Sequence, residues 1–435
     1  IVLRKGKALG FNGSVNSTVG TPDQFQLATN LNQRGKKTNL FSNFGYRYSK
    51  GPGNSYTDLR NFTNGIVTSS RIEDRIWQRR RNSFNANIGL EYFLTKKSNL
   101  TGSFFYRNTK GNNYSENSIE EFDENDLNTD SVVRIQEEDG DDETLQYSLN
   151  YTNNFTNDGH KLTVDFQYSD SKENETAINT EPGFADETNI TNEASKNTLV
   201  QADCVLPIGE NTQFEAGYRG DFQNLTSDFI VTPVSDPDFD PSNNLEFGQD
   251  IHAFYTQYGN KLKQFSFLLG LRLETTDVKV RLLGTNENND FSYTELFPTV
   301  NIGFEATEKQ SYTLGYSRRL RRPRFWYLNP FESRNSQNII FKGNPALIPT
   351  FTNSFDLGYL NRIGKLTLNA SVYYQHSTNN ISRVTRQEIR EINGNDESVL
   401  IREPINLATE DRYGFEFTSN YNASKKVRFD GSFNL

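Results

Sequence analysis

The chain has 435 residues, of which 34% are hydrophobic and 13% aromatic, and its formal net charge is -9. Its mean hydropathy of -0.74 is low for a soluble domain of this length. Disorder is also disfavoured, because disordered chains are poor in aromatic residues and this chain holds 33 Phe and 21 Tyr. The acidic balance disfavours nucleic acid as a partner, because phosphate binding needs a basic face. A transmembrane β-barrel fits this composition, since only the lipid side of each strand must be apolar.

Apolar side chains alternate with polar ones in segments of about ten residues along the whole chain, which is the period of a β-strand. In the segment from Lys161 to Asp170, the apolar set is Leu162, Val164, Phe166 and Tyr168. We count about 17 such strands, the first from Gly10 to Thr21 and the last from Val427 to Leu435. No run reaches the roughly 20 apolar residues of a membrane helix. The fold predicted is all-β, a transmembrane antiparallel barrel with 17 of about 22 strands present.

Short and long connections alternate between these strands. Short turns, often with Lys, occur for example at Arg34-Gly35-Lys36, Thr95 to Ser98 and Thr307-Glu308-Lys309. The long polar stretches run roughly over 49–81, 110–142, 173–194, 224–246, 276–290, 320–349 and 378–411. Outer-membrane barrels have short periplasmic turns and long extracellular loops. We therefore assign the two sets of connections to the periplasm and the cell exterior and predict a multi-pass barrel in the outer membrane of a Gram-negative bacterium.

Tyrosines near the strand ends form two groups under this assignment. Amphipathic rings concentrate at headgroup depth on both sides of a membrane, so we predict two aromatic belts, although Tyr is also simply a good strand residue. The predicted belt residues are Tyr46, Tyr48, Tyr106, Tyr168 and Tyr374 on the outer side, and Tyr92, Tyr151, Tyr258, Tyr359 and Tyr421 near the turns.

Two places in the sequence carry a resemblance to a known family. The opening segment from Ile1 to Thr21 resembles the junction between plug and barrel in TonB-dependent outer-membrane receptors. The stretch YSRRLRRPRFWYLNPF, from Tyr316 to Phe331, with GNPALIPT after it, resembles a signature of the same superfamily. The likeness is strongest to the outer-membrane barrel family common in Bacteroidota, although Thr350 stands where that signature usually has an acidic residue. The resemblance implies that residues 1–7 end a plug domain and that residues 8–435 form a barrel that is incomplete at its C-terminal end.

An enzymatic role is not supported by the sequence. The three His residues lie on different segments, and the single Cys excludes an intramolecular disulfide. No phosphate-binding glycine loop, nucleophile elbow or metalloprotease motif is present. We expect a non-enzyme without a resident cofactor.

An arginine cluster next to aromatic residues is the main candidate for ligand contact. Guanidinium groups suit carboxylates, phosphates and hydroxyls, and aromatic rings offer stacking surfaces. The cluster can contact a ligand or the plug, or it can neutralise acidic groups of the wall, the plug or the lipid headgroups. The candidate residues are Arg318, Arg319, Arg321, Arg322, Arg324, Trp326 and Tyr327.

An acidic stretch from Glu116 to Glu143 is the second charged feature. Clustered carboxylates can bind Ca²⁺, but their spacing does not match an EF-hand loop. We favour a solvated external loop and keep a calcium site as the alternative.

These observations lead to one functional expectation and one alternative. The resemblance implies a TonB-dependent receptor that takes up a scarce or bulky nutrient, either a glycan, a peptide or a metal chelate. The expected partners are outer-membrane lipid and lipopolysaccharide, the TonB complex, and a surface lipoprotein lid or a secretion-system component. The alternative is a barrel that does not transport and instead anchors or assists a secretion or surface-adhesion assembly.

Overall fold

The computed structural model describes residues 9–233, 242–284, 286–333, 339–392, 395–407, 409–424 and 426–435, with the side chains of 391–397 left aside. The predicted plug junction at residues 1–7 lies outside the described residues. The described part contains one short helix, α1 (Phe325–Leu328), and otherwise consists of strands and the connections between them. None of its helices is long and apolar enough to cross a membrane.

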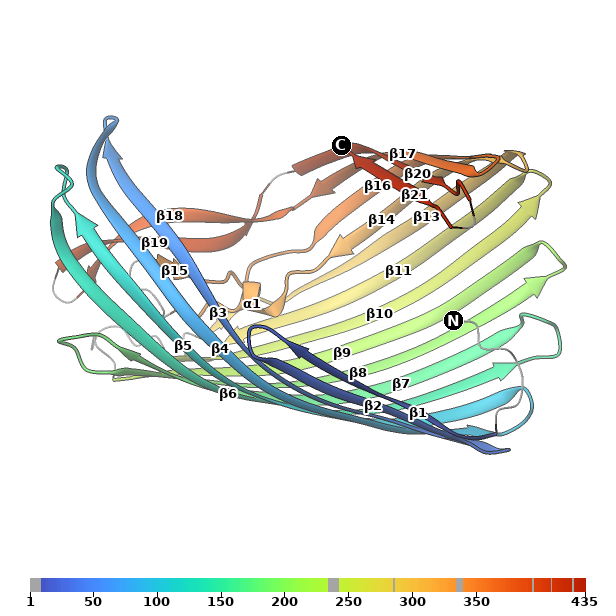
Figure 1. Cartoon of the computed structure of the whole chain (residues 1–435), viewed down its shortest axis with the longest axis horizontal. Coiled ribbons are helices and arrows are strands. Elements are labelled where there is room, and N and C mark those ends of the chain that lie inside the picture. Colours follow the sequence, from blue (N-terminus) through green and yellow to red (C-terminus); the bar gives the residue numbers. More distant parts are fainter. Residues whose placement is uncertain are drawn as a thin grey trace.

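An 18-stranded antiparallel sheet forms the body of the molecule. It curves into a trough, as Figure 1 shows. Strand β1 pairs with β2 at one edge and β21 with β20 at the other. The predicted all-β antiparallel fold is confirmed, and the strand count differs from the expected 17 by β12, which has only 2 residues. A total of 22 strands stays a prediction.

The first nine strands include the longest ones, and β3 to β6 have 25 to 28 residues each. The bounds are β1 (Gly10–Gly20), β2 (Gln24–Arg34), β3 (Thr38–Thr63), β4 (Ile66–Phe93), β5 (Ser98–Phe122), β6 (Asn128–Asn154), β7 (Lys161–Thr180), β8 (Glu187–Ile208) and β9 (Thr212–Thr232).

The remaining strands of the large sheet have at most 20 residues. Their bounds are β10 (Asn243–Leu262), β11 (Phe265–Leu282), β12 (Glu287–Asn288), β13 (Phe291–Thr307), β14 (Gln310–Arg321), β16 (Thr350–Ile363), β17 (Leu366–Thr378), β20 (Thr409–Tyr421) and β21 (Phe429–Asn434). A separate sheet of three strands has the order β15 (Ile339–Phe341), β19 (Asn395–Asn406) and β18 (Ile381–Ile392). Within it, β15 and β19 are parallel.

Much of the length predicted as polar loop is paired strand. Strands β3 and β4 run on past residues 49–81 and meet at a two-residue turn, Asn64-Gly65, with φ values of 53° and 82°. Positive φ at both turn residues matches the twist of a hairpin, and Asn-Gly adopts it readily. Several of the long connections therefore extend the wall as hairpins beyond the membrane, which strands of about 10 residues suffice to cross.

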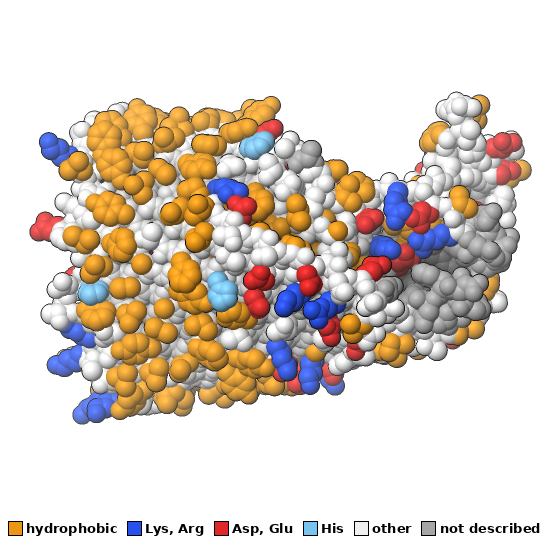
Figure 2. Space-filling view, turned by 180° about the vertical axis from the view of Figure 1, so that it is seen from behind, with side chains coloured by type: hydrophobic (Ala, Val, Ile, Leu, Met, Phe, Trp, Pro, Cys, Tyr) orange, Lys and Arg blue, Asp and Glu red, His pale blue; other side chains and the backbone are white. Residues whose placement is uncertain are grey.

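The outer face of the sheet is apolar only near the short turns. On β7, the outward side chains Leu162, Val164, Phe166 and Tyr168 are followed by Asp170 and Lys172. Figure 2 shows the same division, with apolar side chains over the half of this face at the turn end and charged ones over the other half. The apolar band marks the membrane-facing part of the wall.

On each strand of the large sheet, the side chains of alternate residues point to the concave face. Facing residues of antiparallel strands lie on the same side of a sheet, so the register follows this face from strand to strand. From β11 to β4 the row is Val278, Gln249, Gln223, Asn197, Ser169, Gln146, Phe105 and Asn87. Odd-numbered residues of β4 and even-numbered residues of β11 therefore face the trough.

The hydrophobic core lies on the concave side of β9 to β11. Leu225, Leu245, Phe247, Val278, Val280 and Leu282 of the wall pack with Leu328 of α1 and with Leu347. Figure 1 places α1 inside the trough. The connection from β14 to β16 thus folds inward over these strands.

Candidate functional site: the concave face above the membrane

The predicted arginine and aromatic cluster lies at the end of β14 and in α1, on this inward-folded connection. Leu328 is 3% exposed and Leu347 is 1% exposed, so both anchor the connection to the wall. Pro323 ends the strand because proline lacks the N–H that a ladder needs. The sequence placed the cluster where a strand passes into a long outer connection, and the structure holds most of it against the wall.

Arg322 is bound to acidic and polar groups of the wall. Its Nη2 donates to Glu274 and to Thr276 Oγ1, the latter at 3.1 Å, and its Nε donates to the Tyr293 hydroxyl at 3.1 Å. Arg272 approaches the other carboxylate oxygen of Glu274 at 2.6 Å. The Glu274 side chain is 5% exposed, so two guanidinium groups neutralise one buried carboxylate.

Arg318 and Arg321 are also engaged. Arg318 lies 2.8 Å from a carboxylate oxygen of Glu295 and above the ring of Phe351, at 5.2 Å from its centroid. Arg321 donates to Asn380 Oδ1 at 3.1 Å. These contacts fit the alternative in which the arginines satisfy the wall, although binding of a ligand by them stays a prediction.

Trp326 and Tyr327 form an aromatic group that holds the small sheet. Their ring centroids are 3.9 Å apart, and Phe341 of β15 lies 5.6 Å from Trp326. Arg383 of β18 sits over all three rings, at 5.3 Å from Trp326 and 5.6 Å from Tyr327. A guanidinium over aromatic faces is attracted by their quadrupoles, so Arg383 ties β18 to α1.

Arg319 and Arg324 are the two arginines of the cluster whose side chains are exposed and whose guanidinium groups make no hydrogen bond or ion pair within the described residues. They are therefore the two best placed to meet a ligand. The structure brings all seven predicted residues into one region. Five of them contact the wall or the small sheet, and the guanidinium groups of Arg319 and Arg324 remain exposed.

All ten predicted belt tyrosines point to the outer face. Tyr46 faces Phe84 across β3 and β4, and Tyr359 faces Tyr312 with ring centroids 5.0 Å apart. Tyr374 faces Phe355, which lies 4.9 Å from Tyr316. Outward direction is what a belt requires, and contact with lipid headgroups stays a prediction.

The acidic stretch forms the β5–β6 hairpin, with its tip at residues 123–127. At the tip, the backbone N–H groups of Asn125 and Leu127 donate to Asp123 Oδ1 at 2.8 and 3.0 Å. These bonds favour the ionised carboxyl and lower the pKa of Asp123. Across the described residues, no three His, Cys, Asp or Glu side chains are arranged to hold a metal ion. The calcium alternative stays a prediction.

A hollow that the sequence reasoning missed lies on the concave face of β4 to β7, beyond the apolar band. Its volume is about 480 Å³. One wall carries Arg75, Trp77, Arg79 and Arg81 of β4, and the other carries carboxylates of β6 and β7. The arginine-rich run RIWQRRR over residues 75–81 was a signal in the sequence, because the period of a strand puts Arg75, Trp77, Arg79 and Arg81 on one face.

The carboxylates of this hollow repel one another. Burial, followed by the nearby charges of Glu138 and Glu173, raises the pKa of Glu175 to about 7. On the adjacent strand β8, burial also raises the pKa of Glu193, against the hydrogen bond from Ser227. On the basic wall, burial and then the charge of Arg79 lower the pKa of Arg75. Like charges therefore crowd each side of the hollow.

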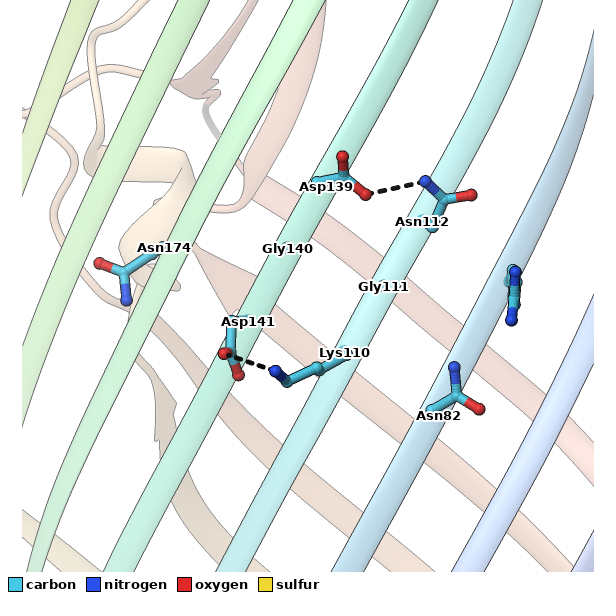
Figure 3. Close-up of a pocket in the computed structure, with 9 residues that line it drawn as sticks. Asn82, Lys110, Gly111, Asn112, Asp139, Gly140, Asp141 and Asn174 are labelled. Atoms are coloured by element: carbon cyan, nitrogen blue, oxygen red, sulfur yellow. Dashed lines mark hydrogen bonds and ion pairs between the residues drawn. The ribbon is translucent and has the colours of Figure 1, made fainter.

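The outer face of the same strands has a second, shallower hollow of about 340 Å³. Figure 3 shows Lys110 turned toward Asp141 and Asn112 toward Asp139, with Asn82 on one side. The Lys110 Nζ to Asp141 Oδ2 distance is 3.6 Å and the Asn112 to Asp139 hydrogen bond is 2.8 Å. The polar groups of this face largely satisfy one another.

Residues 153–435 match the model of a family described as the outer membrane protein beta-barrel family. The chain belongs to this family. The family places it in the outer membrane, as the sequence pattern predicted, and none of the curated proteins matches it.

Solved outer-membrane receptors share the fold. A double mutant of the Serratia marcescens hemophore receptor HasR, in complex with its hemophore HasA and heme, superposes with a TM-score of 0.61 at 12% identity over 98% of this chain and 62% of that one. The alcaligin receptor FauA from Bordetella pertussis superposes with a TM-score of 0.56 at 14% identity, over 99% of this chain and 62% of that one. A mutant of the Pseudomonas aeruginosa ferric enterobactin receptor PfeA superposes with a TM-score of 0.59 at 12% identity, over 98% of this chain and 61% of that one.

The chain spans about three fifths of the length of these receptors. Their barrels confirm the fold that the resemblance to TonB-dependent receptors implied. The shared fold is that of solved outer-membrane receptors.

Proposed function

We propose that this chain is the barrel of a TonB-dependent receptor that takes up a scarce or bulky nutrient across the outer membrane. The observation that carries the proposal is the distribution of polarity on the wall. The outer face is apolar near the short turns, whereas the concave face above that band is lined with guanidinium, carboxylate and amide groups. Such a lining suits a polar solute on its way through a lumen.

The solved structures of similar fold support the same class of function. Those proteins are receptors for the hemophore HasA, seen together with heme, for alcaligin and for ferric enterobactin. These receptors support a scarce nutrient as the class of ligand for this chain. They do not distinguish among a glycan, a peptide and a metal chelate. Energy coupling through TonB and contact with lipopolysaccharide belong to the same proposal, as does a lipoprotein lid.

The test is uptake by the native cell. Deletion of the gene should abolish uptake of at least one compound from a panel of labelled peptides, glycans and metal chelates. A protonophore should abolish the same uptake, because TonB coupling uses inner-membrane energy. Undiminished uptake of every compound, together with loss of a secreted or surface-attached protein, would refute transport and establish the anchoring alternative.

Arg319 and Arg324 provide a finer test of the ligand path. The variant with both changed to Ala should lower uptake at least about fivefold, since each guanidinium hydrogen bond to a charged group contributes about 1.5 to 3 kcal/mol. Arg60→Ala is the matched control, because Arg60 pairs with Asp58 on the β3–β4 hairpin. Unchanged uptake in the double variant would exclude these two residues from the path.

A further inference from the structure

The hollow on β4 to β7 exists because two side chains are absent from its floor. One row of facing residues runs Arg81, Gly111, Gly140 and Glu175 across four strands. A Cβ at Gly111 would meet no atom within 4 Å, and one at Gly140 would meet only the Asn174 carbonyl oxygen at 3.9 Å. The two glycines therefore leave open space between a guanidinium on one side and a carboxylate on the other.

The basic wall has a free guanidinium beside an aromatic surface. The Trp77 indole packs over Gly53, where an added Cβ would come within 2.3 Å of it. The guanidinium carbon of Arg79 sits 5.7 Å from the centroid of the Trp77 ring. Arg81 contacts Asp142 at 3.1 Å and Arg75 donates to Ser115 at 3.1 Å. The Arg79 guanidinium has no hydrogen bond or ion pair to any described residue, so it is available to an anion.

The acidic wall has a carboxylate available to a cation. Glu138 accepts a hydrogen bond from Asn113, whereas the half-buried Glu175 has no hydrogen bond or ion pair to any described residue. Its surroundings are Glu138, Glu173, Glu193 and Asp142, all of the same charge. An ammonium group placed between Glu175 and Glu138 would relieve this repulsion.

We propose that this hollow is a binding site for a zwitterionic ligand, a peptide of two or three residues, whose carboxylate is held by Arg79 and Arg81 and whose ammonium is held by Glu175 and Glu138. A ligand of one sign would meet a wall of like charge, whereas a dipolar one meets opposite charge at both ends. Trp77 offers a stacking surface to a side chain of the peptide.

The dimensions agree with this length. Strands β4 and β7 are three strand spacings apart, about 14 Å between backbones. The Arg and Glu side chains reach into this gap from both sides, and an extended tripeptide spans about 10 Å. The site deepens the proposed receptor function by naming a ligand class, and direct binding tests it without any transport.

The chain has 2 Trp residues, which makes a direct optical test available. In a Trp326→Phe background, folded in detergent, Trp77 is the sole indole. Titration with the tripeptide Gly-Phe-Gly should change its fluorescence in a saturable manner. N-acetyl Gly-Phe-Gly and the C-terminal amide of Gly-Phe-Gly should each bind at least about tenfold more weakly, because each lacks one charged end.

Variants locate the binding. Arg79→Gln and Glu175→Gln should each weaken Gly-Phe-Gly about tenfold, and Gly111→Leu should abolish binding by filling the hollow. Gly102→Leu is the matched control, because Gly102 lies on the same strand, also has no atom within 4 Å of an added Cβ, and faces outward. Circular dichroism and the compact gel band of a folded barrel report whether each variant folds.

Proton release gives a readout that a change in folding would not produce. Binding of an ammonium should ionise Glu175, so calorimetry at pH 7 in phosphate and in Tris should yield different heats, with proton release lost in Glu175→Gln. Equal affinity for the three peptides, no affinity for any of them, or unchanged binding in Gly111→Leu would each overturn the site. Absence of binding with intact uptake of another nutrient would reject the site and leave the proposed function standing.

Discussion

The concave face differs between two regions at the same end of the barrel. Under α1, strands β9 to β11 present an apolar surface with Leu245 and Val280 each 1% exposed. On β4 to β7, the same face presents the arginines and carboxylates around the glycine hollow. A chain segment covers the first region, whereas the second is open.

The difference shows what decides the polarity of an inward-facing position. A side chain facing the lumen meets water unless another segment of the chain covers it, and only covered positions gain from being apolar. Charged groups remain where the wall is uncovered, and there they are accessible to solutes. The open region is therefore the better candidate for ligand contact, and the covered region positions the connection that carries the arginine cluster.

Removing an anchor of the covered region should have the largest effect. Leu347→Ala leaves a cavity under the inward-folded connection and should cost about 2 to 5 kcal/mol, since Leu347 is 1% exposed. Denaturant unfolding in detergent measures the loss, and limited proteolysis should cut 322–349 faster. Leu283→Ala, at a site 55% exposed, should change stability by less than about 0.5 kcal/mol. Equal losses of unfolding free energy in the two variants would contradict the burial of Leu347 between the connection and the wall.

Glu274→Gln should have the next largest effect. It leaves Arg272 and Arg322 without their shared carboxylate, and removal of one partner from a buried pair costs about 3 kcal/mol. The same unfolding assay applies. Its control is Glu305→Gln, because the Lys261–Glu305 pair is more than half exposed on both sides and should contribute less than about 1 kcal/mol. A cost below that of the control would show that Arg322 does not depend on Glu274.

Gly53→Val should disturb the open region moderately. The added Cβ would collide with the Trp77 indole, and overpacking of this kind costs about 1 to 3 kcal/mol. In a Trp326→Phe background, emission from Trp77 should shift to the red as the ring leaves the wall. Gly51→Val has nothing within 4 Å of its added Cβ and should leave the emission unchanged. The same spectrum in both variants would refute the packing of Trp77 on Gly53.

Stability should also depend on pH. Since the folded protein raises the pKa of Glu175 from 4.5 to about 7, it binds this proton more tightly than the unfolded chain does. The contribution of Glu175 to stability is therefore full below pH 4.5 and is lost as the pH rises toward 7. Glu175→Gln should flatten this slope and be more stable than the wild type at pH 8. Identical slopes in both proteins would show that Glu175 is not perturbed.

Much of the fold follows from the sequence because the membrane enforces period 2. Segments such as Lys161 to Asp170 alternate clearly, since one side meets lipid and the other meets water. Beyond the membrane both faces of a hairpin are wet, so alternation disappears and a strand looks like a loop. The stretch from Glu116 to Glu143 is the clearest case, because it was expected as a loop and is the β5–β6 hairpin.

The site was less predictable, because its parts meet only through the register. The arginine cluster was visible as a run in the sequence, but its division into bound Arg322 and exposed Arg319 depends on Glu274, 48 residues away from Arg322. The hollow depends on Gly111 facing Gly140 across two strands. Pairing of β15 with β19 likewise joins segments about 60 residues apart. No local pattern encodes such contacts.

Accessibility of the two regions in intact cells tests the comparison most directly. In a Cys204→Ser background, Arg79→Cys and Val280→Cys place one thiol each in the open and the covered region, and a membrane-impermeant maleimide is added to the cells. We expect rapid labelling of the Arg79→Cys variant and little labelling of the Val280→Cys variant until the protein is unfolded. Equal labelling of both, or faster labelling of the Val280→Cys variant, would contradict the account.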